Sequence, residues 1–305
     1  MCSDSSYAAS VTTPLTSWPR EDCSLPGRTI SVRHAPGLEA GLPTAVYIHG
    51  LGGSSLNWTD LMGRLQPYVD GYALDLGGMG YSPPPRDGDM SPAGHARSAA
   101  ELIDSIGNGP VHLFGNSLGG AVALQLAGRR PDLVRSLTLV SPALPSLFAT
   151  KSNFHLPVIA VPGIGERLVP KYLESDAGGR VRGTIDVTFA DPSRISSERL
   201  AEAVAEVKER DTLPYASDAF LASLRGLLKT FVDVGPNRPW KLAERVTCPT
   251  LVVYGRKDPL VDPRSAHRVT KHFRDAHVVV LPDSGHVAQM EHPEFVAAAW
   301  ERFLR

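Results

Sequence analysis

Short apolar runs alternate with longer amphipathic stretches along much of the chain. The runs are bounded by glycine, proline or polar residues, which is typical of strands buried on both faces of a parallel sheet. The stretches between them repeat their apolar residues with helical spacing. The expected strands are 29–34, 44–48, 69–74, 111–114, 136–140, 250–254 and 277–281, and the expected helices are 56–65, 92–106, 118–129, 263–273 and 293–304.

The alternation of strand and helix stops at Ser141-Pro142 and resumes at residue 250. In between, helical segments dominate, notably 197–210 and 217–231, and no run resembles a core strand. At the other end, the first residues are rich in Ser, Thr and Pro and have no period. The pattern predicts an α/β fold with a doubly wound, mostly parallel sheet. Its expected parts are an N-terminal tail at 1–27, a core formed by 28–142 and 241–305, and a helical cap inserted at 143–240.

Composition excludes some classes of function. The chain has 305 residues, of which 42% are hydrophobic and 21% are charged, as is ordinary for a soluble globular protein. A formal net charge of −1 provides no attraction to nucleic acid or to anionic membranes. No apolar run has the length of a membrane span, and no basic and apolar leader is visible at the N-terminus.

The three cysteines, Cys2, Cys23 and Cys248, do not have the spacing of metal ligands, and their odd number argues against a disulfide framework. A reducing compartment, and hence a cytoplasmic location, is therefore expected. We expect neither a metal nor a cofactor, and the sequence leaves the oligomeric state open.

The most informative motif follows the apolar run 111–114. It reads Gly115-Asn116-Ser117-Leu118-Gly119-Gly120 and leads directly into the helical stretch 118–129. Gly-x-Ser-x-Gly alone is a weak pattern, but a strand before it and a helix after it put the serine on a sharp, strained turn with its hydroxyl exposed. Ser117 is therefore the candidate nucleophile.

A serine hydroxyl needs a base to become nucleophilic, and the base needs an acid to orient it. In open parallel sheets such groups lie on loops at the carboxyl ends of the strands. Asp258 follows the strand 250–254, and His286 follows the strand 277–281. The nearest rival acid, Asp262, precedes Pro263 and is better interpreted as a helix N-cap.

A reaction at a carbonyl also needs N–H donors for the developing oxyanion. One candidate is the backbone N–H of Leu118, at the start of the helix directly after Ser117. The other belongs to the loop after strand 44–48, where we favour the N–H of Leu51 over that of Gly52.

Together these motifs resemble the α/β-hydrolase fold superfamily, in its group of enzymes with a helical cap. The resemblance covers about 28–142 and 246–305, and it implies that Ser117, Asp258 and His286 form a catalytic triad. It departs from the family pattern in one loop, where Gly77 and Met79 stand in place of the usual proline and histidine. The matching stretches are 49–53, 75–82, 115–120, 255–259 and 285–286.

The resemblance implies a hydrolase of carboxylic esters as the leading function. A C–C bond hydrolase of meta-cleavage products stays open, because those enzymes share the Gly-Asn-Ser elbow and an ending like 285–292, although Val287 replaces their usual aromatic residue. Their oxyanion loop also differs from the stretch 50–53. A noncatalytic ligand-binding protein is the alternative from another class.

The expected partner is a small-molecule ester held between the core loops and the cap. An apolar lining is typical of ligand pockets, but such residues can equally form the cap's own core. The candidate lining residues are Gly52, Asn116, Leu144, Phe148 and Val287.

Overall fold

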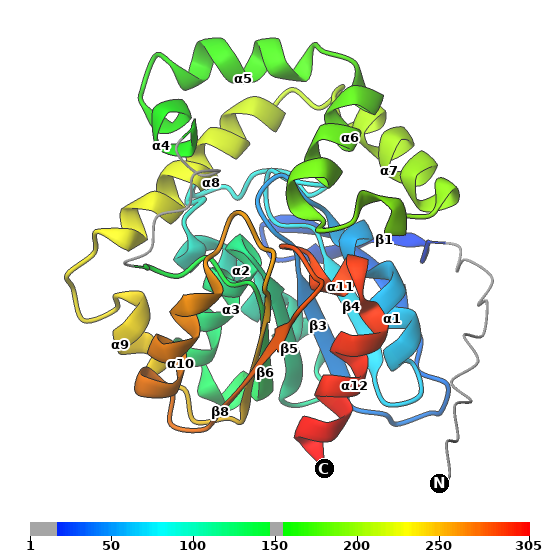
Figure 1. Cartoon of the computed structure of the whole chain (residues 1–305), viewed down its shortest axis with the longest axis vertical. Coiled ribbons are helices and arrows are strands. Elements are labelled where there is room, and N and C mark those ends of the chain that lie inside the picture. Colours follow the sequence, from blue (N-terminus) through cyan, green and yellow to red (C-terminus); the bar gives the residue numbers. More distant parts are fainter. Residues whose placement is uncertain (1–16, 147–154) are drawn as a thin grey trace, which may run out of the picture.

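A mostly parallel sheet of eight strands forms the centre of the computed structural model, which describes residues 17–146 and 155–305 (Figure 1). The strand order is β1-β2-β4-β3-β5-β6-β7-β8, in which β2 runs antiparallel to both of its neighbours. Each strand expected from the sequence is present, with bounds that move by at most two residues. The strands are β1 (Arg20–Leu25), β2 (Arg28–Ala35), β3 (Thr44–Ile48), β4 (Asp70–Leu74), β5 (Val111–Asn116), β6 (Val134–Val140), β7 (Thr250–Gly255) and β8 (Ala276–Leu281).

Helices cover both faces of this sheet, as the alternating pattern predicted. Tyr47 packs with Trp58 and Trp300 on one face, while its neighbour Ile48 packs with the helices of the other face. Every residue of β3, β5 and β7 is buried, which explains why these strands read as continuous apolar runs. The helices of the core are η1 (Ser55–Trp58), α1 (Thr59–Leu65), α2 (Pro92–Ile106), α3 (Leu118–Arg129), η2 (Pro131–Leu133), α9 (Pro239–Ala243), η5 (Pro263–Ser265), α10 (Ala266–His272), α11 (Ala288–Glu291) and α12 (Pro293–Leu304).

The expectation of an N-terminal tail over 1–27 is wrong for its last part, because Arg20–Leu25 forms the edge strand β1 and pairs with β2. Only Leu25 of this strand is buried, since an edge strand pairs on one side and needs no apolar run. Pro26-Gly27 joins the two strands, and Gly27 has a φ of 82°, which suits the third position of a type II turn. This turn signal was the feature that the sequence interpretation overlooked.

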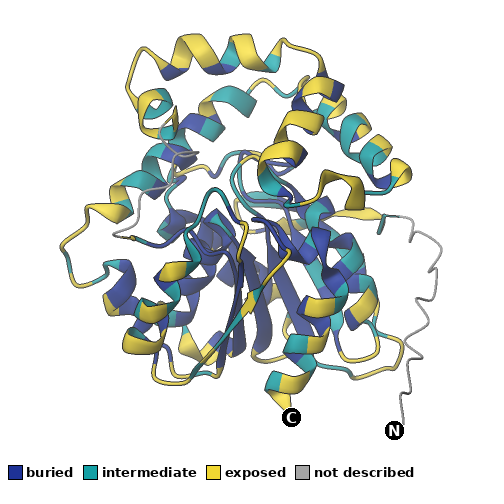
Figure 2. Ribbon diagram, viewed as in Figure 1, coloured by how far each residue is buried: buried dark blue, intermediate teal, exposed yellow. Residues whose placement is uncertain are grey.

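A layer of helices lies between β6 and β7 in the sequence. In space it covers one end of the strands of the sheet (Figure 1). We call 155–231 the helical insertion. Its outermost helices are largely exposed, whereas the central strands of the sheet beneath are buried (Figure 2). Across the described residues, no helix is both long and apolar enough to cross a membrane. The insertion consists of α4 (His155–Ala160), α5 (Gly165–Leu173), α6 (Ala177–Thr188), η4 (Pro192–Arg194), α7 (Ser197–Arg210) and α8 (Ala216–Phe231).

Candidate active site

Ser117 lies on the turn between β5 and α3 in a strained backbone conformation. Its φ of 54° and ψ of −117° are unusual for a residue with a side chain, and its N–H donates to the carbonyl of Val140 at 3.1 Å. The side chain of Ser117 is half-buried, in contrast to the fully buried start of α3. The structure therefore has the strained strand-to-helix turn that the sequence predicted for this serine, with the side chain half-buried.

Glycines allow this turn to pack against its neighbours. A Cβ atom on Gly119 would lie 2.1 Å from the carbonyl oxygen of Ile48, and one on Gly115 would lie 2.3 Å from the carbonyl oxygen of Gly119. These distances are far below van der Waals contact, so a side chain at either position would push α3 away from the sheet. The motif is thus required by close approach of the backbone.

His286 and Asp258 form a buried pair on the loops that follow β8 and β7. Nδ1 of His286 lies 2.9 Å from Oδ2 of Asp258, and the two side chains are 5% and 0% exposed. Oδ1 of Asp258 accepts from the N–H groups of Leu260 and Val261, at 2.8 and 2.9 Å. With the Nδ1 proton donated to Asp258, Nε2 of His286 is the nitrogen left for a reacting group.

The pKa of Asp258 reflects opposing influences. Burial alone would raise it, but the His286 ring and the hydrogen bonds from His286 and Val261 hold the pKa below its ordinary value. Asp262 has a different environment, since its side chain accepts from the N–H of Arg264 and caps η5. The sequence-based preference for Asp258 as the partner of the histidine therefore agrees with the geometry.

Asn116 connects the serine turn to the histidine loop. Its amide donates to the carbonyl of Val140 at 3.0 Å and to the carbonyl of His286 at 3.1 Å. Because Asn116 is buried and both bonds end on backbone, it holds two loops together instead of lining a pocket. Among the described residues no hydrogen bond joins the Ser117 hydroxyl to the His286 ring, and such bonds are often loose without substrate.

The turn 50–53 after β3 lies beside Ser117. A Cβ atom on Gly50 would lie 3.2 Å from Cβ of Ser117, and Gly52 takes a φ of 73° that favours glycine. Within the described part of the chain, the N–H groups of Leu51 and Leu118 have no hydrogen-bond acceptor. Both donors are thus available next to the serine.

The buried ring of His49 holds this turn through hydrogen bonds. Its Nδ1 lies 2.7 Å from the carbonyl oxygen of Gly50, and its Nε2 accepts from the N–H of Leu76 at 3.0 Å. Burial lowers the pKa of His49 to about 4, so the ring is neutral at pH 7 and carries its proton on Nδ1.

The remaining pocket candidates have diverse positions. Val287 is buried and packs with α6 of the helical insertion, directly after His286. Leu144 belongs to the main core, and Phe148 lies outside the described residues. Gly52 faces Phe220 of α8, whose ring lies 3.5 Å from a Cβ built on that glycine. Sequence reasoning missed Phe220, because helical periodicity does not tell which apolar side chain faces a distant turn.

Glu291 is a second residue whose role the sequence did not reveal. Its Oε1 accepts from the N–H groups of Ala190 and Asp191, both at 2.8 Å, and its Oε2 accepts from the N–H of Gly285 at 2.6 Å. The N–H of His286 donates to the carbonyl of Thr188 at 2.6 Å. The histidine loop is therefore fastened to the end of α6 by a fully buried carboxylate.

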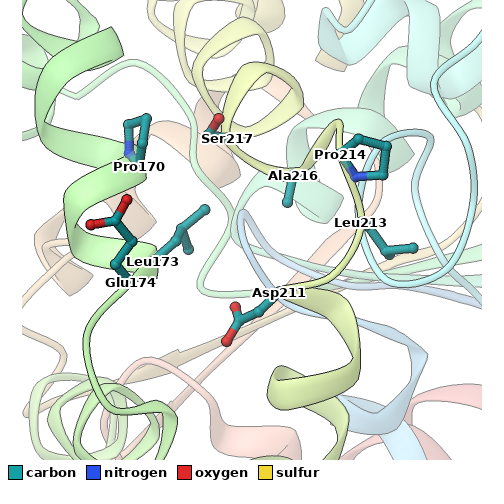
Figure 3. Close-up of a pocket in the computed structure, with 8 residues that line it drawn as sticks. All are labelled: Pro170, Leu173, Glu174, Asp211, Leu213, Pro214, Ala216 and Ser217. Atoms are coloured by element: carbon teal, nitrogen blue, oxygen red, sulfur yellow. The ribbon is translucent and has the colours of Figure 1, made fainter.

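A hollow of about 360 Å³ lies within the helical insertion, between α5 and the connection from α7 to α8 (Figure 3). None of its lining residues belongs to the candidate site. Elsewhere in the described ranges, no cluster of His, Cys, Asp and Glu has the arrangement of a metal site. The hollow is lined by Pro170, Leu173, Glu174, Asp211, Leu213, Pro214, Ala216 and Ser217.

Known proteins resemble this chain over most of its length. The sequence model of the alpha/beta hydrolase fold matches residues 43–293. A dihydrolipoyllysine-residue acetyltransferase component of an acetoin cleaving system from Pseudomonas putida is 30% identical over 88% of the chain, and the matched part spans 65% of that relative. A pimeloyl-[acyl-carrier protein] methyl ester esterase from Neisseria meningitidis is 30% identical over 84% of this chain and 91% of the relative.

Other similar proteins are named for different substrates. A 2-hydroxy-6-oxononadienedioate/2-hydroxy-6-oxononatrienedioate hydrolase from Klebsiella pneumoniae is 28% identical over 88% of both chains. Among solved structures, a 2-hydroxy-6-oxo-6-phenylhexa-2,4-dienoate hydrolase from a Rhodococcus species superposes with a TM-score of 0.74 at 23% identity, covering 94% of this chain and 99% of that one. At this identity the superposition bears on the fold alone.

Proposed function

This chain belongs to the α/β-hydrolase fold family, and its relatives include an esterase similar to it over most of its length. We propose that it is a serine hydrolase that cleaves carboxylic esters of small or lipid-like substrates. The observation that carries the proposal is the buried pair of His286 and Asp258, joined through Asn116 to the strained turn of Ser117. A buried acid and base, tied to the turn that carries a half-buried serine, have the composition of an acyl-transfer site.

In the proposed reaction, Oγ of Ser117 attacks the ester carbonyl carbon while Nε2 of His286 takes the hydroxyl proton. Asp258 keeps the imidazole in the required tautomer and stabilises the imidazolium. The N–H groups of Leu51 and Leu118 stabilise the tetrahedral oxyanion. When the intermediate collapses, the alcohol leaves with the proton from His286 and an acyl-enzyme remains. Water, deprotonated by His286, then attacks the acyl carbon, and the acid and free serine are released.

We further propose that residues 143–240 act as a cap that determines which acyl group fits. Phe220 faces Gly52 beside the serine, and Val287 packs against α6 directly after the catalytic histidine. An apolar wall at these positions favours an apolar acyl chain. The esterase from Neisseria meningitidis, which is named for a pimeloyl methyl ester, is consistent with such a substrate class.

A C–C bond hydrolase is the second candidate. It is supported by the Klebsiella pneumoniae relative, which is similar over as much of this chain as any relative described above. A vinylogous ring-fission diketone tested beside p-nitrophenyl esters of increasing acyl length distinguishes the two. Faster turnover of the diketone would move the C–C reaction ahead of ester cleavage.

The decisive test replaces the nucleophile. Ser117→Ala should retain the fold and lose about four to six orders of magnitude in ester turnover, whereas Ser24→Ala, on the exposed edge strand, should behave as wild type. A fluorophosphonate probe should label the wild type and the Ser24 variant and leave the Ser117 variant unlabelled. Near wild-type turnover without Ser117 would refute the proposal, and a wild type that neither labels nor hydrolyses would favour a noncatalytic binding protein.

A further inference from the structure

A charged side chain of the helical insertion reaches the turn beside the serine. Arg210 is the last residue of α7, and its Nη2 donates to the carbonyl oxygen of Gly52 at 3.0 Å. We propose that Arg210 is a positioning residue that aims the N–H of Leu51 at the oxyanion. This inference rests on the proposed function, because it assigns a role within the same site.

Two planar peptide groups in series connect Arg210 to the N–H of Leu51. The carbonyl of Gly52 and the N–H of Gly53 belong to one trans peptide, so they point in opposite directions. Arg210 holds that carbonyl, and the N–H of Gly53 donates to the carbonyl of Gly50 at 3.1 Å. The carbonyl of Gly50 shares a second trans peptide with the N–H of Leu51. Fixing the first peptide at its oxygen therefore fixes the direction of the Leu51 N–H.

The second peptide has one further support, from His49. Its Nδ1 lies 2.7 Å from the carbonyl oxygen of Gly50, on the side away from the Leu51 N–H. No other hydrogen bond among the described residues ends on the carbonyl of Gly52. Loss of the Arg210 side chain should therefore loosen the turn at Gly52 without releasing it from the core at Gly50.

A buried carboxylate holds Arg210 in place. Oε1 of Glu206, one turn earlier on α7, lies 3.5 Å from Nη1 of Arg210, and its Oε2 accepts from Arg33 of β2 at 3.0 Å. The hydroxyl of Ser54, directly after the turn, also donates to Glu206. Glu206 is almost fully buried and Arg210 mostly so, which reduces screening by solvent and keeps the guanidinium fork in one geometry.

The consequence is that the helical insertion contributes to the chemistry as well as to specificity. Removing an oxyanion donor outright lowers kcat by about 10²–10³, so a donor that is present but poorly aimed should lower kcat by roughly 10- to 100-fold. Because the oxyanion forms only after substrate has bound, KM should change by less than about threefold. The loss should be the same for short and long acyl chains.

The experiment compares Arg210→Gln with Lys208→Gln. Lys208 is exposed on the same helix and makes no hydrogen bond to another described residue, so its variant removes the same charge without touching the turn. Steady-state kinetics on p-nitrophenyl acetate and a longer ester give kcat and KM, and the inhibition constant of a trifluoromethyl ketone reports binding of the tetrahedral adduct. We expect the ketone to bind Arg210→Gln more weakly by the factor lost in kcat/KM, and Lys208→Gln to match the wild type.

Equal kcat and ketone affinity in the two variants would overturn the inference, as would a loss expressed only in KM or only on long esters. If Arg210→Gln does not fold, Arg210→Lys takes its place, because lysine keeps the positive charge beside Glu206 but lacks the planar guanidinium group. The same selective loss in kcat is expected for this variant. A wild type that neither hydrolyses esters nor reacts with a fluorophosphonate would instead refute the proposed function.

Discussion

Replacing Glu291 with glutamine should destabilise the protein and disorder its histidine loop. The carboxylate is 1% exposed and accepts hydrogen bonds from Ala190, Asp191 and Gly285, with the Ser284 hydroxyl at 3.3 Å from its Oε2. Glutamine has the same shape but only one acceptor oxygen. Whichever way the amide turns, its NH₂ group faces an N–H donor that the carboxylate had satisfied.

The cost follows from the better of the two orientations. If the amide oxygen keeps the bonds from Ala190 and Asp191, the hydroxyl of Ser284 can turn to accept from the NH₂ group. The N–H of Gly285 is then buried without a partner, which costs about 1–3 kcal/mol, and the surviving bonds lose the strength given by a charged acceptor. We expect a loss of about 2–4 kcal/mol in the free energy of unfolding, or about 3–6 °C in Tm.

Urea unfolding followed by circular dichroism, together with kcat on a short ester, measures both consequences. Glu294→Gln is the matched control, because Glu294 is 33% exposed and its ion pair with Arg194 should contribute less than about 1 kcal/mol. Since Gly285 precedes His286, kcat should also fall in Glu291→Gln, by up to about 100-fold. Stability and kcat equal to those of the Glu294 variant would refute the reasoning.

Three further outcomes are expected. Asp258→Asn should lower kcat by about four orders of magnitude through the wrong imidazole tautomer, whereas Asp262→Asn should lower it less than about tenfold; the reverse order in kinetics would exclude Asp258 as the acid. Phe220→Ala should change the preference between long and short acyl esters by about 10- to 200-fold and leave acetyl ester turnover nearly unchanged. The measurement is kcat/KM across the ester series, and an equal loss on all esters would contradict a specificity role. Acid should destabilise the fold between pH 6.5 and about 4, because the unfolded chain protonates three histidines there while burial lowers their pKa and keeps them neutral in the folded state. Each histidine contributes up to about 1.4 kcal/mol per pH unit to this loss of unfolding free energy. A flat profile of unfolding free energy against pH over this window would contradict the expectation. The three are His49, His95 and His112.

The sequence by itself determined the fold class and the order of the candidate site residues. Continuous apolar runs show parallel strands buried on both faces, and the carboxyl ends of such strands meet at one edge of the sheet. The position of Asp258 after β7 and of His286 after β8 therefore sufficed to predict that the two side chains lie together, as they do at 2.9 Å. The glycines around Ser117 likewise showed a close strand-to-helix turn.

Only the tertiary structure decided how the helical insertion meets this site. Periodicity shows which face of α7 is polar, but the carbonyl that Arg210 reaches lies 158 residues away in the sequence. The same holds for Glu291, whose acceptor oxygens meet N–H groups about 100 residues away, and for Phe220 above Gly52. The edge strand β1 escaped detection because pairing on one side leaves its sequence mostly polar. Contacts of this kind depend on how separate elements are placed in space, and neither hydrophobic pattern nor local propensity encodes that placement.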